Sequence, residues 1–117
     1  MSFALLHRVS KYGVRHPGRL GGARPRAGLL SNPQIAWVGA SRAFVAVWLA
    51  EGQDSVGTDV FGRVLGADAT PLGWGFRLSL PTAPGHDPPA LAAGGPNAVA
   101  VWAEESTSTV YARVITP

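Results

Sequence analysis

The sequence contains no cysteine, which excludes disulfides and metal or redox centres built on thiolates. It also lacks a long apolar run, since the longest, residues 43–50, is far shorter than the roughly 20 residues that a membrane-spanning helix needs. The first residues show neither a signal-peptide core nor a clear cleavage site. No membrane span is expected, and the cellular compartment is left open.

Recognisable catalytic motifs are missing as well. There is no P-loop, nucleophile elbow, HExxH or EF-hand pattern, and Gly73-Trp74-Gly75 lacks the third glycine of a dinucleotide-binding loop. The three histidines, His7, His16 and His86, do not share a spacing typical of metal ligands. Motifs alone therefore do not decide whether the protein is an enzyme.

Acidic residues are absent from the first 31 positions. This segment carries six Lys and Arg residues, whereas residues 32–117 carry four Arg against seven Asp and Glu, so the net charge of +3 conceals a basic N-terminal segment. We expect residues 1–31 to be a flexible arm that includes part of a strand. A nucleic-acid binder is less favoured, because no aromatic residue that could stack on bases interrupts residues 15–26.

What the sequence does have is turns and short apolar runs. Its 15 glycines and 10 prolines accompany a hydrophobic content of 46%, and no segment keeps a helical period over ten residues. We predict strands at residues 34–38, 43–49, 58–65 and 74–80. Because residues 44–49 are apolar at consecutive positions, that strand is expected to be covered on both faces.

An internal repeat organises these strands. Residues 44–48 (FVAVW) recur as 98–102 (AVAVW), and residues 33–36 align with 88–91 at an offset of 55. Residues 60–64 (VFGRV) recur as 110–114 (VYARV) and, more weakly, resemble residues 5–9 (LLHRV). About four short strands in a repeat of about 50 residues predict a propeller blade. The expected fold is all-β, with about two four-stranded antiparallel blades in residues 32–117.

The repeat region resembles the tandem β-propeller-type repeats of large bacterial surface or secreted proteins. The resemblance is carried by Phe61-Gly62-Arg63, Asp68, Pro71-Leu72-Gly73, Phe76, Leu78, Pro88, Val99, Val101 and Trp102. Ala69 stands where the repeats usually have a turn glycine. The resemblance implies a propeller and a surface or secreted parent protein, but it implies no particular chemistry.

Two blades do not make a ring. A propeller needs roughly four to eight blades, because each blade buries its faces against its neighbours. We therefore predict a homo-oligomer and favour three chains with six blades. The alternative is that the chain is a piece of a longer array of repeats.

Several side chains are candidates for a site. Trp48 and Trp102 repeat and are expected to seal the contact between blades, whereas the unrepeated Trp37, whose aligned position is Ala92, and Trp74 are candidates for ligand binding. Arg63 and Arg113 repeat within apolar strands, where each would bind an anion or a structural partner. The structural partners would be backbone carbonyls or the acids of preceding loops, which are Glu51, Asp54, Asp59, Glu104 and Glu105.

Two functions stay open beside the nucleic-acid binder. The first is a binding or scaffold module for a glycan or a protein. The second is a metal-assisted hydrolase of phosphate or sulfate esters at a pore or chain interface. Glu51, Asp54 and Asp59 are the predicted metal ligands, because their oxygens suit Ca²⁺ or another divalent cation.

Overall fold

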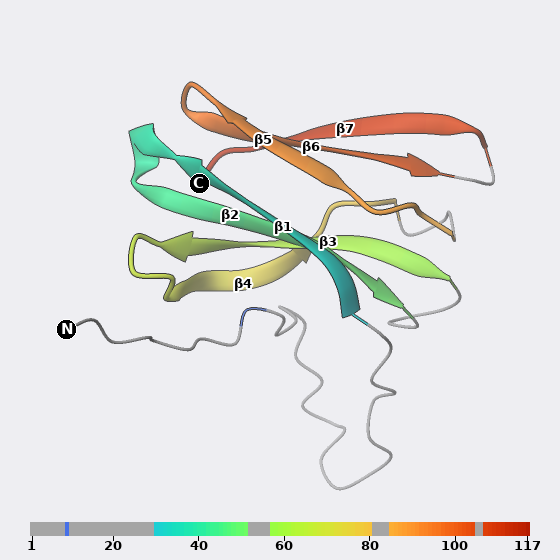
Figure 1. Cartoon of the computed structure of the whole chain (residues 1–117), viewed down its shortest axis with the longest axis horizontal. Coiled ribbons are helices and arrows are strands. Elements are labelled where there is room, and N and C mark those ends of the chain that lie inside the picture. The colour runs from blue at the N-terminus through green and yellow to red at the C-terminus, as the bar shows by residue number, and fades with distance from the viewer. Residues whose placement is uncertain (1–8, 10–29, 52–56, 81–84, 105–106) are drawn as a thin grey trace, which may run out of the picture.

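The computed structural model describes residue 9 and residues 30–51, 57–80, 85–104 and 107–117, and in this part the chain is all-β. Two antiparallel sheets account for the strands (Figure 1). Sheet A has the order β1-β2-β3-β4, and sheet B has the order β5-β6-β7. The bounds are β1 Leu30–Val38, β2 Ala43–Glu51, β3 Thr58–Gly66, β4 Pro71–Arg77, β5 Ala90–Gly94, β6 Asn97–Glu104 and β7 Thr109–Ile115. The all-β prediction is confirmed.

The four strands predicted for the first repeat are all present. The predicted ranges 34–38, 43–49 and 58–65 lie within β1, β2 and β3, whereas β4 starts and ends three residues before the predicted 74–80. The early start is possible because Pro71 is the first residue of its strand, where a missing N–H costs little. Within the described residues, the helical conformation is limited to the 3₁₀ turn Gly39–Ser41, and no helix could cross a membrane.

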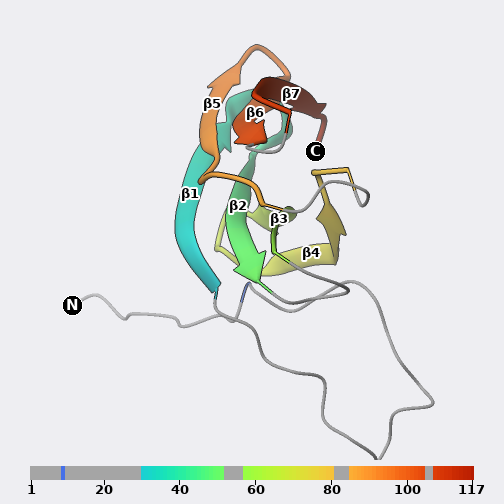
Figure 2. The ribbon, with the colours of Figure 1, turned by 90° about the vertical axis from the view of Figure 1, so that its right-hand side faces the viewer.

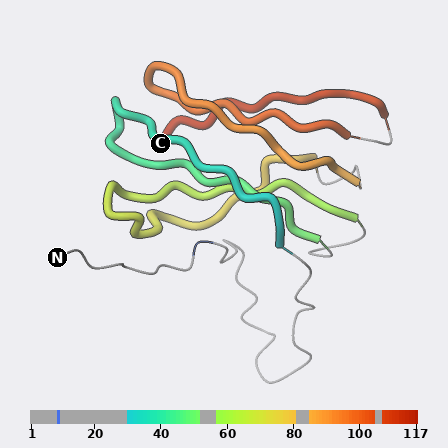
Figure 3. Tube along the Cα trace, viewed as in Figure 1, coloured from blue at the N-terminus to red at the C-terminus, as the bar shows by residue number. Residues whose placement is uncertain are grey.

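The strands of each sheet follow one another as a meander (Figure 3), and short turns join β1 to β2, β3 to β4 and β5 to β6. In the turn between β3 and β4, Asp68 Oδ1 accepts a hydrogen bond from the N–H of Thr70 at 3.0 Å, and Ala69 N donates to Gly66 O at 2.9 Å. Ala69 has a φ of 71°, a left-handed conformation that favours glycine. The turn thus forms with an alanine in the left-handed conformation, at the position where the resemblance to the repeats implies a glycine.

Sheet B repeats the strand pairing of sheet A. Trp48 lies opposite Phe61 in sheet A, and Trp102 lies opposite Tyr111 in sheet B. In the same way, Ala46 pairs with Arg63, and Ala100 pairs with Arg113. The sequence offset of 54 residues therefore relates equivalent positions of β2 and β6. The offset of 50 residues relates equivalent positions of β3 and β7.

The predicted alignment of the first strands, β1 and β5, was wrong by one residue. Ile35 lies opposite Ala46 and Leu91 lies opposite Ala100, so Leu91 is the equivalent of Ile35 and the offset is one residue more than the 55 predicted. Trp37 consequently corresponds to Ala93, not to Ala92. A shift of one residue moves every side chain to the other face of a strand, and a short apolar match does not reveal which face is meant.

The second unit also differs in strand number. Two four-stranded units were expected, but sheet B has three strands in the described part of the chain. The edge strand β7 pairs with β6 on one side. Of the two four-stranded units that were predicted, the described residues thus form one sheet of four strands and one of three.

The two sheets stack face to face around the main core (Figure 2). Sheet A contributes Val38, Val45, Val47, Leu49 and Val60, and sheet B contributes Ala98, Ala100, Trp102 and Ile115. Leu78, which follows β4, completes this cluster. Trp102 therefore lies in the contact between the two sheets, whereas Trp48, for which the same place was predicted, lies on the other face of sheet A.

Sheet A carries a second apolar cluster on its other face. Ala46, Trp48, Ala50, Phe61 and Leu65 are buried there, and Phe44 and Val9 pack against them. Residues of β2 thus alternate between the two clusters, which confirms the prediction of a strand covered on both faces.

Candidate functional site

Five buried polar or charged side chains occur in the described residues, and four of them gather at one end of the sheet stack. These four are Asp59 at the start of β3, Ser79 after β4, His86 before β5 and Glu104 at the end of β6. They come from both sheets and from the segment that connects them. Because buried polar groups need partners, this polar cluster is the first place to look for chemistry.

His86 is the centre of the cluster. Its backbone N–H donates to Thr58 Oγ1 at 2.8 Å, and the Thr58 hydroxyl donates to the His86 carbonyl at 2.8 Å. Its ring Nδ1 is hydrogen-bonded to the Thr58 carbonyl oxygen. A carbonyl oxygen only accepts, so Nδ1 carries a proton and donates it. These contacts fix the ring between the two sheets.

The other ring nitrogen faces Glu104. His86 Nε2 lies 3.5 Å from Glu104 Oε2, and neither atom has a hydrogen-bond partner among the described residues. Glu104 Oε1 accepts a hydrogen bond from the hydroxyl of Thr107 at 2.7 Å. His86 Nε2 and Glu104 Oε2 therefore face each other across the contact between the sheets.

Asp59 holds the sheet A side of the cluster. Its Oδ2 lies 3.3 Å from Arg77 Nη2, and its Oδ1 accepts a long hydrogen bond of 3.4 Å from the hydroxyl of Ser79. Asp59 Oδ1 is also 3.8 Å from His86 Nδ1. The Arg77 guanidinium lies over the ring of Phe61, 5.6 Å from its centroid. The cluster is thus a polar bridge that ties sheet A to sheet B.

The predicted metal ligands end up in different surroundings. Glu51 is exposed at the end of β2, opposite Thr58, whereas Asp59 is buried in the polar cluster. Asp54 lies outside the described residues. In the ranges that the structure describes, no three His, Asp or Glu side chains are grouped so that they could hold a metal ion.

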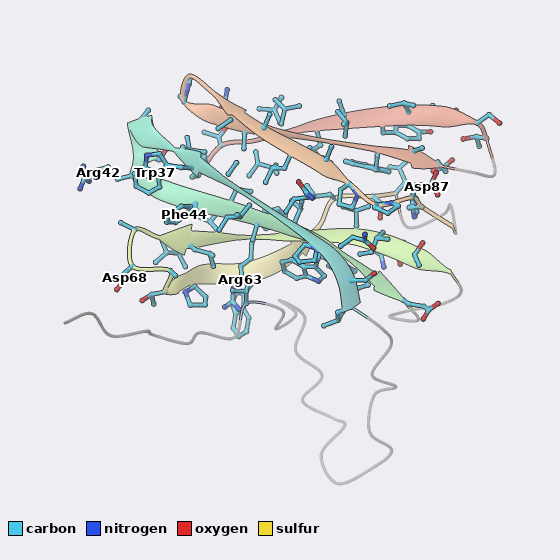
Figure 4. The ribbon with its side chains drawn as sticks, in the orientation of Figure 1. Trp37, Arg42, Phe44, Arg63, Asp68 and Asp87 are labelled. Atoms are coloured by element: carbon cyan, nitrogen blue, oxygen red, sulfur yellow. The ribbon has the colours of Figure 1, made fainter. Side chains whose placement is uncertain are left out.

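The two repeated arginines bind backbone carbonyls. Arg63 is buried, and its Nε and Nη2 donate to the carbonyl of Gly73 at 3.0 and 2.7 Å. Arg113 donates from Nη1 to the carbonyl of Leu78 at 2.9 Å and so connects β7 to sheet A. Backbone carbonyls and loop acids were the two kinds of structural partner predicted for Arg63 and Arg113, and these hydrogen bonds are to carbonyls. Figure 4 shows Arg63 on the side of sheet A that faces away from sheet B.

Both unrepeated tryptophans are accessible. Trp37 is 42% exposed near the end of β1, and Trp74 is 49% exposed on β4. The ring of Trp37 packs on Phe44 with a centroid distance of 4.8 Å and an interplanar angle of 58°, and Figure 4 shows the two rings side by side. Trp37 pairs with Phe44, and Phe44 pairs with Leu65, so the three lie in one row across sheet A.

A cavity of about 470 Å³ lies over the same sheet and was not foreseen from the sequence. Its walls are mostly apolar and come from residue 9 and strands β1, β2 and β3. They are formed by Val9, Leu30, Ser31, Pro33, Gln34, Ile35, Ala46, Trp48 and Leu65. The sequence feature that could have indicated the cavity is the run of consecutive apolar residues in β2, which places apolar side chains on both faces of sheet A.

Comparison with protein-family models, with curated proteins and with solved structures finds no match.

Proposed function

We propose that the chain is a non-catalytic binding and scaffold module made of two propeller-type blades, which further copies complete into a ring. The observation that carries the proposal is that sheet B repeats the residue pairing of sheet A. The Trp48–Phe61 and Ala46–Arg63 pairs of sheet A recur as the Trp102–Tyr111 and Ala100–Arg113 pairs of sheet B.

The arrangement of the two sheets supports this proposal. Each sheet is a meander in sequence order, as a blade is, and the two pack face to face. The first strands, β1 and β5, are in contact and lie on the same side of the stack (Figure 2). Adjacent first strands are what a radial arrangement requires, because the innermost strands of neighbouring blades meet around a central axis.

Three copies would supply six blades, within the range of roughly four to eight that closed propellers use. Such a ring has the closed cyclic symmetry that is usual for homo-oligomers. Light scattering at several protein concentrations tests this proposal. A single species of three chains is the expected result, while a chain that stays monomeric at every concentration contradicts ring assembly.

The proposed ligand is a glycan or a protein partner that stacks on exposed aromatic rings. Trp37 and Trp74 are the candidates, since about half of each side chain is accessible. An ester hydrolase is not adopted as a second candidate, because the carboxylate of Asp59 already contacts Arg77 and Ser79.

A glycan array followed by titration of the ligands found would test this binding role. Trp37→Ala and Trp74→Ala should each weaken binding about tenfold or more, because each removes a stacking surface. Leu72→Ala is the control, since Leu72 is equally exposed on the same strand as Trp74. Equal binding by all three variants would exclude the tryptophans as the ligand site.

A further inference from the structure

The contact between the sheets of one chain joins two different surfaces. Sheet A contributes the face that carries Val45, Val47 and Val60. Sheet B contributes the face that carries Ala98, Ala100 and Trp102. Under the repeat, these sheet B residues correspond to Phe44, Ala46 and Trp48, which lie on the opposite face of sheet A. The two units are therefore stacked head to tail.

Head-to-tail stacking leaves one unpaired surface on sheet B, which we name the valine face. It consists of Val99, Val101, Val110 and Val114, with Ala90, Ala92 and Ala112 opposite or beside them in the strand register. The four valines are 37%, 36%, 72% and 59% exposed. Their equivalents in sheet A are Val45, Val47, Val60 and Val64, of which the first three are fully buried against sheet B. The valine face thus has the composition of a buried contact but lies open.

The second surface is the opposite face of sheet A, and we name it the tryptophan face. Its side chains are buried in the single chain, where Val9 packs against them. Its residues Ala46, Trp48, Phe61 and Leu65 are the equivalents of Ala100, Trp102, Tyr111 and Ile115, which receive sheet A inside the chain. The cavity of about 470 Å³ lies over this face and is bounded in part by Ala46, Trp48 and Leu65. The tryptophan face is therefore equivalent to the surface of sheet B on which Val45, Val47 and Val60 pack. The cavity over it provides space for side chains of a second copy.

We propose that the valine face of one copy docks on the tryptophan face of a second copy and so repeats, between chains, the contact that joins sheets A and B within one chain. This inference rests on the proposed pair of blades. It adds to that proposal which two surfaces meet between copies and that they meet head to tail. Burial of the exposed valines against an apolar face is the driving force, since Ala46, Trp48, Phe61 and Leu65 are apolar. Arg63 on the same face already donates to the Gly73 carbonyl. Because the two surfaces differ, the contact is heterologous and can continue from copy to copy until a ring closes.

Val9 marks where the incoming copy would sit. It follows Arg8 in the sequence, as Val64 follows Arg63 and Val114 follows Arg113. Val64 packs against the cluster that contains Trp102, and Val9 packs against the cluster that contains Trp48. Val9 thus takes the place that Val114 of a second copy would take, and docking of that copy requires Val9 to leave.

Two single substitutions test the docking, one on each face. Val110→Asp places a carboxylate on the valine face, and Ile35→Asp places one beside the cavity of the tryptophan face. Both side chains are mostly exposed in one chain, at 72% and 59%, so each variant should fold, which circular dichroism verifies. Each should weaken self-association at least about tenfold in sedimentation velocity, because docking would bury the new charge. Leu80→Asp is the matched control, since Leu80 is 45% exposed and belongs to neither face.

Mixing the two variants gives the decisive result. Val110→Asp keeps a functional tryptophan face and Ile35→Asp keeps a functional valine face, so an equimolar mixture should form a heterodimer that neither variant forms alone. A mixture that stays monomeric overturns the proposal, as does parent-like assembly of either variant. The binding role is tested separately, because the glycan titration can be done on monomeric Val110→Asp protein with Trp37 and Trp74 intact.

Val9→Asp distinguishes the two occupants of the tryptophan face. If a second copy docks there, a charged residue 9 leaves the cluster more easily and self-association should tighten. If self-association weakens instead, residue 9 belongs to the docking surface, and the proposed exchange is wrong.

Discussion

At the scale of single residues, His86 is a buried side chain that connects the two sheets. It lies between carboxylates of different sheets, with Asp59 on one side and Glu104 on the other. Its ring Nδ1 and its backbone both bond to Thr58. Removing a side chain from such a buried cluster leaves polar groups without partners, which costs more than the bonds themselves contribute.

His86→Ala should therefore lower the free energy of unfolding by about 3 kcal/mol, since Glu104 would remain buried without its neighbour. Glu104→Gln should cost less, because its neutral amide can donate an N–H to Nε2 of His86. Urea denaturation measures both values. Asp87→Ala is the control, since it keeps the backbone bond from Asp87 N to Ala103 O. A cost for His86→Ala no greater than the cost for Asp87→Ala would show that the polar cluster does not tie the sheets together.

At the scale of elements, the turn between β3 and β4 contains a residue in a strained backbone conformation, which a glycine would relieve. Ala69 adopts a φ of 71°, although its Cβ disfavours the left-handed conformation. Ala69→Gly should raise the free energy of unfolding by about 0.5 to 1 kcal/mol, as measured by thermal or urea denaturation. Ala67→Gly in the same turn is the control, because Ala67 does not have a positive φ. Equal effects of both substitutions would show that backbone strain at Ala69 is not the cause.

Strand positions could be predicted from the sequence because the signals are local. Apolar runs bounded by Gly, Pro, Asp and Ser located β1, β2 and β3. The repeated FVAVW and VFGRV motifs correctly aligned β2 with β6 and β3 with β7. The first strands were misaligned by one residue, since their apolar composition does not reveal which face each side chain occupies.

The polar cluster could not be predicted in the same way. His86 follows a segment rich in glycine and proline, and on the sequence it has no spacing that relates it to Asp59 or Glu104. Its position depends on how the connection between β4 and β5 crosses from sheet to sheet, which is a tertiary property. The arginines were a partial success, because Arg63 and Arg113 do bind carbonyls, but Gly73 and Leu78 could not be named in advance.

At the scale of the whole molecule, the proposed docking surfaces are mainly apolar, and Arg63 on the tryptophan face is buried and bonded to the Gly73 carbonyl. This predicts how assembly responds to salt. Raising the ionic strength from about 0.05 M to about 0.5 M shortens the Debye length and weakens contacts between charged groups. Self-association should nevertheless change by less than about threefold in light scattering, because apolar burial drives it. Strong dissociation by salt would instead indicate that charged residues, such as those of the basic segment 1–31, form the contact.

A contact between two unlike faces also has a genetic consequence. A copy with a damaged valine face still offers an intact tryptophan face, so it joins a growing ring and stops it there. With equal amounts of normal and damaged chains, only about one random set of three chains in eight would contain normal copies alone and could close the proposed ring. Substitutions on the valine face, such as Val110→Asp, should therefore act dominantly over the normal gene, whereas a substitution that simply unfolds the chain should be recessive.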